Sequence, residues 1–379
     1  MNLLSLCIFI FVLMFAIGTV TPIVPLYASS LGASWTDIGL LGTSWGITLM
    51  LLAFVGGRLS DRYGRKPLLV ASAALSVVAA FLYLASSTVL QVILIRIVEG
   101  AAWALFWPTV EALATEIVEP TAAGRAIGIA TATYGIAFAS SSLVGGYITS
   151  LLGYSATFNA YLLLALASTL AAILLLKETS RRDIVLLSRT RDGLRFSSFR
   201  SPTILLAYFL GGAYTFGFGI VITLFSVYAN TLGVAVFLIG LLFGSFWVGR
   251  IVGSVSGGHL SDQLGRGPIV IIAMIGSTVG FIVVAFSTGI ALLFAGIIVL
   301  GLSVGAIFPV AVALISDNVD QSERGFSMGM FETACAAGFM LAASFGGILS
   351  DLYSPRMPYL LAGTVALACA IIFAAKRAK

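Results

Sequence analysis

Three charged residues inside long apolar stretches are the first candidates for chemistry. Arg96 and Glu99 lie three positions apart, so on a helix they share a face and can form an ion pair. Glu332 lies in a separate apolar stretch. A charge in apolar surroundings is costly unless it is paired or hydrated, and such residues commonly mark ion or substrate pathways. Both carboxyl groups are candidates for proton exchange or substrate contact. The alternative for Glu99 is a static pair with Arg96 that only stabilises packing, and the alternative for Glu332 is a carboxylate hydrated from the cytoplasmic cavity.

An aromatic stripe continues from the first of these carboxylates. Glu99, Trp103, Trp107 and Glu111 recur every four residues, which places them on one side of a helix. The two tryptophans would line an apolar binding surface or pack against neighbouring helices. Either arrangement makes these four residues candidates for coupling or substrate contact.

The second half of the chain carries its own polar candidates. Arg250 is a potential partner for Glu332 or for an anionic group of a substrate. The tyrosines Tyr27 and Tyr214 are weaker candidates for substrate contact.

A charged link between two apolar stretches occurs twice. Residues 56–67 read GGRLSDRYGRKP and residues 257–268 read GGHLSDQLGRGP, at an offset of 201 positions. A glycine-rich, charged link repeated at a fixed offset indicates two copies of one structural plan. The link residues either set topology only or also gate a conformational change. The gating candidates are Gly57, Asp61, Arg62, Gly64, Arg65, Lys66, Asp262 and Arg266.

The composition requires a membrane. Apolar residues make up 60% of the chain and charged residues only 9%, whereas soluble domains carry about 25% charged residues. The apolar stretches reach about 20 residues, the length that crosses a bilayer as a helix, and they lack the alternation of barrel strands. We therefore predict an all-α integral membrane protein with twelve spans. Their predicted limits are residues 3–28, 37–57, 67–86, 88–114, 125–149, 155–176, 202–229, 236–257, 268–286, 289–314, 325–349 and 357–375.

The positive charges predict the orientation of the spans. Every Lys and Arg lies in links or termini on one side of the membrane, except Arg96 and Arg250 within spans and Arg356 on the opposite side. The positive side is cytoplasmic, so we expect a multi-pass protein of the cell (plasma) membrane with both termini in the cytoplasm. The net charge of +5 is explained by this topology, and we expect no nucleic-acid partner.

The internal repeat extends through both halves of the chain. Glycine and proline matches at the offset of 201 include Gly100 with Gly301 and Pro108 with Pro309. We therefore predict two pseudo-symmetric six-helix bundles in parallel orientation. The expected limits are 1–176 for the first bundle, 177–200 for a polar cytoplasmic linker and 201–379 for the second bundle. Residues between two such halves can face either side of the membrane in turn.

On these motifs the chain resembles the major facilitator superfamily. Residues 57–66 follow that family's G-x-x-x-D-R-x-G-R-[RK] motif, and Arg96, Glu99 and Gly100 match its R-x-x-[QE]-G motif on the fourth span. The resemblance covers nearly the whole chain and implies twelve helices in two bundles. One departure concerns the family's drug antiporters, which often carry G-P-x-x-G-G on the fifth span. Here residues 141–146 read SSLVGG, which weakens the interpretation of this chain as a drug antiporter.

The resemblance also implies roles for the link. Asp61 would cap the N-terminus of span eleven near Gly325 and hold the cytoplasmic side shut, as a carboxylate at a helix N-terminus does. The cations after it would pair with carboxylates such as Glu111, Glu116 or Glu119. The second copy has Gln and Gly where the first has Arg62 and Lys66, so we expect its latch to be weaker.

We expect a monomeric secondary transporter that moves a small molecule by alternating access and is coupled to protons. Efflux of hydrophobic compounds is our first hypothesis, and transport of a sugar or organic anion is the alternative. A non-transporting membrane sensor is a hypothesis of another class. The sequence contains no nucleotide-binding loop, paired metal ligands or serine-elbow pattern, so we expect no enzyme, no cofactor and no metal.

Overall fold

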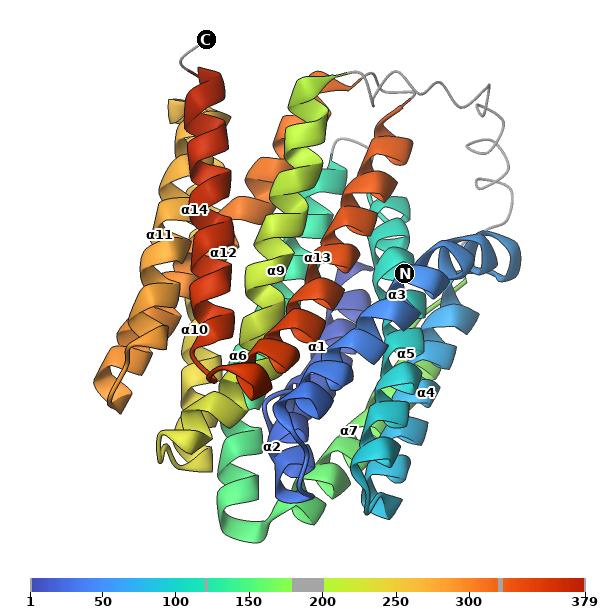
Figure 1. The fold of residues 1–379 in the computed structure, drawn as a ribbon. Coiled ribbons are helices and arrows are strands. Elements are labelled where there is room, and N and C mark those ends of the chain that lie inside the picture. Colours follow the sequence, from blue (N-terminus) through green and yellow to red (C-terminus); the bar gives the residue numbers. More distant parts are fainter. Residues whose placement is uncertain (1, 120–121, 179–200, 320–322, 378–379) are drawn as a thin grey trace. The chain divides into compact units, whose positions relative to one another are not determined.

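The computed structural model describes residues 2–119, 122–178, 201–319 and 323–377, and these residues form helices without any strand. Figure 1 shows the helices in chain order. The helices of the first half are α1 (Leu3–Val20), α2 (Ile23–Ser30), α3 (Trp35–Tyr63), α4 (Arg65–Ala85), α5 (Val89–Glu116), α6 (Ala123–Leu152) and α7 (Tyr154–Leu175). Those of the second half are α9 (Pro202–Thr231), α10 (Val236–Leu264), α11 (Arg266–Ala285), α12 (Ile290–Asn318), α13 (Arg324–Leu352) and α14 (Met357–Arg377).

These helices correspond to the twelve predicted spans. The first span, Leu3–Ser30, is interrupted before Ile23, where Pro22 precedes α2, because a proline cannot donate the backbone hydrogen bond that a continuous helix requires. Among the described residues, eleven segments are long and apolar enough to cross a membrane. The remaining expected span is α3, which is 29 residues long.

The chain divides into two compact units. The first unit comprises the described residues of Met1–Ala33, Ser44–Arg189 and Ala235–Gly244, and the second comprises those of Ser34–Thr43, Thr190–Val234 and Ser245–Lys379. The first residues of α3, up to Thr43, therefore belong to the second unit and the rest of α3 to the first. The first residues of α10, up to Gly244, belong to the first unit and the rest of α10 to the second. The predicted bundle limits at 176 and 201 stay a prediction, and residues 179–200 of the expected linker lie outside the described residues.

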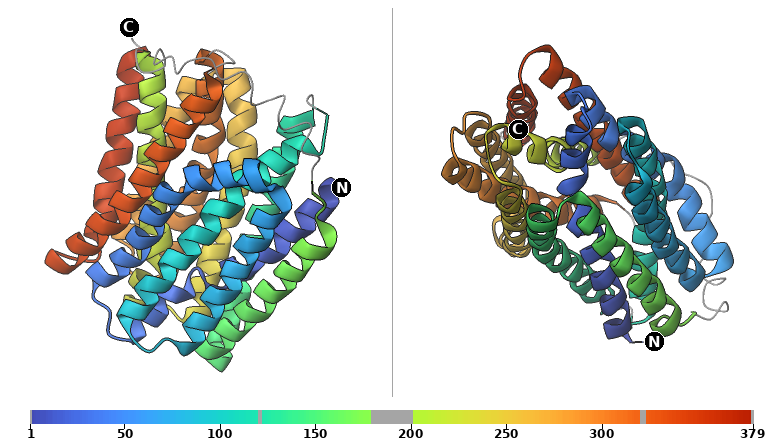
Figure 2. Two further views of the ribbon diagram at one scale, coloured as in Figure 1. Left: turned by 90° about the vertical axis from the view of Figure 1, so that its right-hand side faces the viewer. Right: turned by 90° about the horizontal axis from the view of Figure 1, so that it is seen from below.

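The same helix packing occurs in both units. In the first unit α1 packs against α6 and α7, and α4 packs against α5 and α7. In the second unit α9 packs against α13 and α14, and α11 packs against α12 and α14; Figures 1 and 2 show α11 beside α14. These are equivalent pairs in the internal repeat, which indicates that both units are built on one plan.

Glycines allow close backbone approach at equivalent places in the two units. A Cβ atom added at Gly100 would lie 2.8 Å from the carbonyl oxygen of Trp45. A Cβ atom at Gly301 would meet the carbonyl oxygen of Phe246, the residue that the repeat relates to Trp45. Small residues are common where membrane helices pack closely, because packing and not water exclusion drives their association.

Single glycines form the link between helices in both copies of the charged motif. Gly64, between α3 and α4, has φ +100°, and Gly265, between α10 and α11, has φ +89°. Residues with a Cβ atom rarely adopt such positive φ values. The two glycines therefore permit a one-residue turn that brings the next residue, Arg65 or Arg266, to the start of the following helix.

Candidate functional site

The arginine after the first glycine turn is buried in an ionic network. Arg65 donates hydrogen bonds from Nε and Nη2 to Oε1 of Glu116, at 3.0 and 2.7 Å, and from Nη1 to Oγ of Ser60 at 2.6 Å. Its side chain is 7% exposed and that of Glu116 is 19% exposed. The backbone N–H of Arg65 also donates to the carboxylate of Glu178 at 2.9 Å. The network ties the links α3–α4 and α5–α6 of the first unit to each other.

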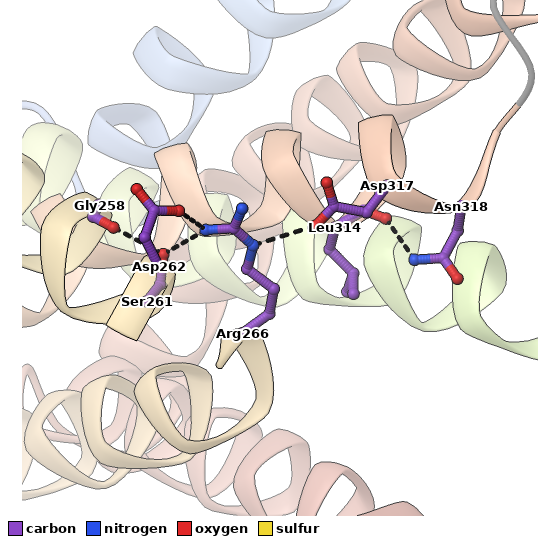
Figure 3. A network of polar contacts seen from close by, with 7 residues as sticks. All are labelled: Gly258, Ser261, Asp262, Arg266, Leu314, Asp317 and Asn318. Atoms are coloured by element: carbon purple, nitrogen blue, oxygen red, sulfur yellow. Dashed lines mark hydrogen bonds and ion pairs between the residues drawn. The ribbon is translucent and has the colours of Figure 1, made fainter. Parts of the chain in front are cut away.

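The second unit repeats the arginine, serine and carboxylate contacts of this network (Figure 3). Arg266 donates from Nη1 to Oγ of Ser261 at 2.7 Å and from Nε to Oδ2 of Asp317 at 3.1 Å. It also forms an ion pair with Asp262. Ser261 and Asp317 are the repeat equivalents of Ser60 and Glu116. The Arg266 side chain is 25% exposed and that of Asp317 52% exposed, so water screens the second copy more strongly.

The other residues of the first link have separate positions. Arg62 is exposed, and its guanidinium lies 5.4 Å from the ring centre of Tyr63. Lys66 donates from Nζ to the carbonyl oxygen of Ile173 in α7 at 2.7 Å. Gly57 and Asp61 belong to α3, but their surroundings lie outside what the structure describes, so the expected cap of Asp61 on span eleven stays a prediction.

The intramembrane pair of the first unit is formed as the spacing predicts. Arg96 and Glu99 make an ion pair in α5, and their side chains are 17% and 8% exposed. The hydroxyl of Tyr83 in α4 donates a hydrogen bond to Oε2 of Glu99 at 3.1 Å, and the hydroxyl of Tyr161 in α7 lies 3.5 Å from Oε1. Glu99 is thus held by three helices, an arrangement that favours a structural role in this conformation.

Aromatic rings follow Glu99 along α5. Trp103 and Trp107 are stacked at 6.3 Å between ring centres, and both contact Tyr134 of α6. Trp103 also contacts Trp45 of α3. The predicted stripe therefore exists as an aromatic cluster, which the half-buried Glu111 follows one turn later.

In the second unit, Arg250 lies among aromatic rings. It donates from Nη2 to the hydroxyl of Tyr214 at 2.8 Å. Its guanidinium lies 4.8 Å from the ring centres of both Phe218 and Trp247, within the range of cation–π attraction. Arg250 and Tyr214 were separate candidates in the sequence, and the structure brings them together.

The expected pairing of Arg250 with Glu332 is absent from the described residues. Glu332 is exposed on α13 and forms no hydrogen bond or ion pair with the described part of the chain. It is nevertheless close enough to Tyr214 and Cys335 to act on both electrostatically. The reason for the missing pair is that the hydroxyl of Tyr214 and two aromatic faces already surround the guanidinium of Arg250.

Tyr27 occupies a packed position in the first unit. Its hydroxyl donates to the carbonyl oxygen of Ser86 at 2.6 Å, and its ring contacts those of Tyr154 and Phe158. These contacts explain the position of the Tyr27 side chain without a contact to a substrate.

Sequence reasoning missed several residues of these networks. The repeat offset applied to Glu116 points to Asp317, and this signal was available in the sequence. Tyr83 and Tyr161 approach Glu99 from other helices, and no spacing predicts that contact. Among the described residues no three His, Cys, Asp or Glu side chains gather as metal ligands would.

Comparison with known proteins identifies the family. The sequence model of the Major Facilitator Superfamily matches residues 6–228 and 207–378, which together cover almost the whole chain. The chain belongs to the major facilitator superfamily. Members of this superfamily are membrane transporters and not enzymes, so the predictions of an all-α transporter fold and of a chain that is not an enzyme are confirmed.

Two relatives illustrate the range of similar sequences. The uncharacterized MFS-type transporter YceJ of Bacillus subtilis is 27% identical over 353 residues, which cover 89% of this chain and 87% of YceJ. The quinolone resistance protein NorA of Staphylococcus aureus is 29% identical over 151 residues, 40% of this chain and 39% of NorA.

Two solved structures share the fold. A variant of the nucleoside transporter NupG superposes with a TM-score of 0.82 at 15% identity, covering 99% of both chains. A bacterial homologue of the human lysosomal transporter Spinster, in an inward-facing and unoccupied conformation, gives a TM-score of 0.76 at 14% identity, covering 98% of this chain and 94% of that one.

Proposed function

We propose that this superfamily member is a secondary active transporter that exports hydrophobic compounds by alternating access in exchange for protons. The observation that carries the proton coupling is Glu332. Glu332 is an exposed carboxylate on a membrane-spanning helix and accepts no hydrogen bond from the described residues, so it is available to bind a proton or a cationic group. Glu99 is the second candidate, but its ion pair and tyrosine contacts would have to rearrange before it could exchange a proton.

The hydrophobic nature of the proposed substrate rests on the aromatic clusters. Trp103, Trp107 and Tyr134 form one cluster in the first unit, and rings around Phe218 form another in the second. Aromatic side chains supply large apolar contact areas with polar edges, as sites for drug-sized ligands do. The name of NorA as a quinolone resistance protein agrees with export of such compounds.

An organic anion is the second candidate substrate, and Arg250 is the observation that favours it. A guanidinium held between aromatic faces can bind a carboxylate in bidentate fashion. Sugar transport and a non-transporting sensor remain the other hypotheses to be tested. A cell-membrane location, cytoplasmic termini and a monomeric state are further parts of this proposal, as is gating by the charged links of both units.

Flux through purified protein in liposomes tests the proposal. Vesicles with an imposed pH difference receive ethidium as the hydrophobic probe, and benzoate or glucose in parallel assays. One pH unit is worth about 1.4 kcal/mol per proton, so one-for-one exchange supports about tenfold accumulation. We expect ethidium to accumulate in this way, and a sensor would show no flux of any probe.

A variant of Glu332 tests the coupling step. Glu332→Gln keeps the size of the side chain but cannot exchange a proton, so we expect it to lose accumulation driven by the pH difference. The matched control is Glu119→Gln, at an exposed carboxylate between α5 and α6. Ethidium accumulation by Glu332→Gln at the level of the control would show that Glu332 is not the coupling group.

A further inference from the structure

A carboxylate at the end of α13 caps the beginning of α3. Asp351 accepts hydrogen bonds from the backbone N–H of Trp35 at 3.1 Å and of Thr36 at 2.7 Å, and from the hydroxyl of Thr36 at 2.6 Å. The first N–H groups of a helix have no partner within it, and the helix dipole favours a negative charge there. Asp351 therefore supplies to α3 a cap that comes from another helix.

The two helices remain in close contact over the following turns. A Cβ atom added at Gly347 would lie 3.0 Å from the Cα atom of Gly39, and the hydroxyl groups of Thr43 and Ser344 lie 2.8 Å apart. We call this contact of Ser34–Thr43 with α13 the α3–α13 seam. It lies within the second unit, whereas the rest of α3, from Ser44 onward, belongs to the first unit.

The equivalent contact in the first unit lacks the carboxylate. There Gly240 of α10 approaches Gly146 of α6 just as Gly39 approaches Gly347, with 3.0 Å from each added Cβ atom to the facing Cα atom. The position that the repeat relates to Asp351 is Ser150, whose hydroxyl donates to a carbonyl oxygen of its own helix. The ionic cap is therefore specific to one of two otherwise similar seams.

We propose that Asp351 is a latch that holds the α3–α13 seam closed and that must release Trp35 and Thr36 during the transport cycle. A motion of one unit against the other must either bend α3 near Thr43 or part this seam. On the topology expected from the positive charges, this end of α3 faces the outside, so release of the latch accompanies opening to the outside. The inference rests on the proposed alternating-access function.

Chemical labelling measures the seam directly. In protein whose native cysteines are replaced by alanine, Ser344→Cys places a thiol in the seam, and a membrane-impermeant maleimide added from outside reports how often the seam opens. We expect Asp351→Asn to raise the labelling rate about threefold, because it removes the negative charge that the dipole of α3 favours, and such a charge changes a local equilibrium by about this factor.

A control within the same helix end separates the latch from local fraying. Asp37 accepts hydrogen bonds from the N–H and hydroxyl of Ser34, at 2.9 and 2.7 Å, and forms no hydrogen bond with the described residues of α13. Asp37→Asn removes the same charge and should leave the labelling rate unchanged. Equal rates for Asp351→Asn and the parent, or equal increases for both variants, would overturn the proposal.

A cross-link gives a second reading. Thr43→Cys together with Ser344→Cys should form a disulfide readily on oxidation, and Asp351→Asn should reduce its yield. If Asp351→Asn fails to reach the membrane, Thr36→Val removes one of the three donors and must still raise labelling. If the proposed transport function is wrong, no flux will be measured, but the labelling rates of the variants can still be compared. The transport hypothesis and the latch hypothesis can therefore be refuted separately.

Discussion

The Arg96–Glu99 pair permits a quantitative test of a structural role. Glu99→Gln preserves the shape of the side chain and an acceptor for the Tyr83 hydroxyl. It removes the carboxylate that forms an ion pair with the guanidinium of Arg96. Both side chains are largely withdrawn from solvent, at 17% and 8% exposure, so little screening by water is available.

The expected cost follows from that burial. Removing one partner of a buried ion pair typically costs about 3–5 kcal/mol, because the remaining charge is left uncompensated. Replacing both partners removes this penalty, so Arg96→Met combined with Glu99→Gln should recover most of the lost stability. The double variant should therefore be more stable than the single one.

Unfolding of the purified protein in detergent, followed by denaturant or heat, measures these differences. Ethidium flux in liposomes is recorded for the same variants. A Glu99→Gln variant with parental stability and no flux would refute the structural account and assign Glu99 to transport. Equal destabilisation of single and double variants would show that the pair is not the source of the effect.

Two further predictions concern the charged links. Glu116→Gln removes the carboxylate that pairs with the 7%-exposed Arg65 and should cost about 3–5 kcal/mol, whereas Asp317→Asn in the more exposed second copy should cost about 0–1 kcal/mol; denaturant unfolding compares them, and equal costs would contradict the assigned difference in burial. Gly64→Ala forces a residue with a Cβ atom to φ +100° and should cost about 1–3 kcal/mol, while Gly128→Ala, where an added Cβ atom has no neighbour within 4 Å, should be nearly neutral. A neutral Gly64→Ala in the same unfolding assay would show that the turn does not require glycine.

The sequence predicts much of the fold because bilayer physics leaves few alternatives. Apolar stretches of bilayer length must form helices, since backbone groups find no water in the membrane. The offset of 201 positions relates Ser60 to Ser261 and Arg65 to Arg266, and the structure shows that the networks of these residues match as well. Local spacing was also sufficient to predict the Arg96–Glu99 pair.

Contacts between helices distant in the sequence could not be predicted. The expected partner of Glu332 was Arg250, but aromatic rings and Tyr214 surround that guanidinium instead. The cap of Asp351 on α3 joins residues more than 300 positions apart, and no periodicity within one helix encodes it. Which side chains meet across helices depends on helix rotation and tilt, which packing decides.

Proton movement that accompanies substrate movement tests the central claim most directly. Liposomes containing the protein and a trapped pH-sensitive dye are given ethidium from outside, with no initial pH difference and with the membrane potential clamped. The account predicts that ethidium enters while protons leave, so the lumen becomes more alkaline, and that Glu332→Gln abolishes this change. Ethidium entry through the protein with a constant internal pH would contradict exchange for protons.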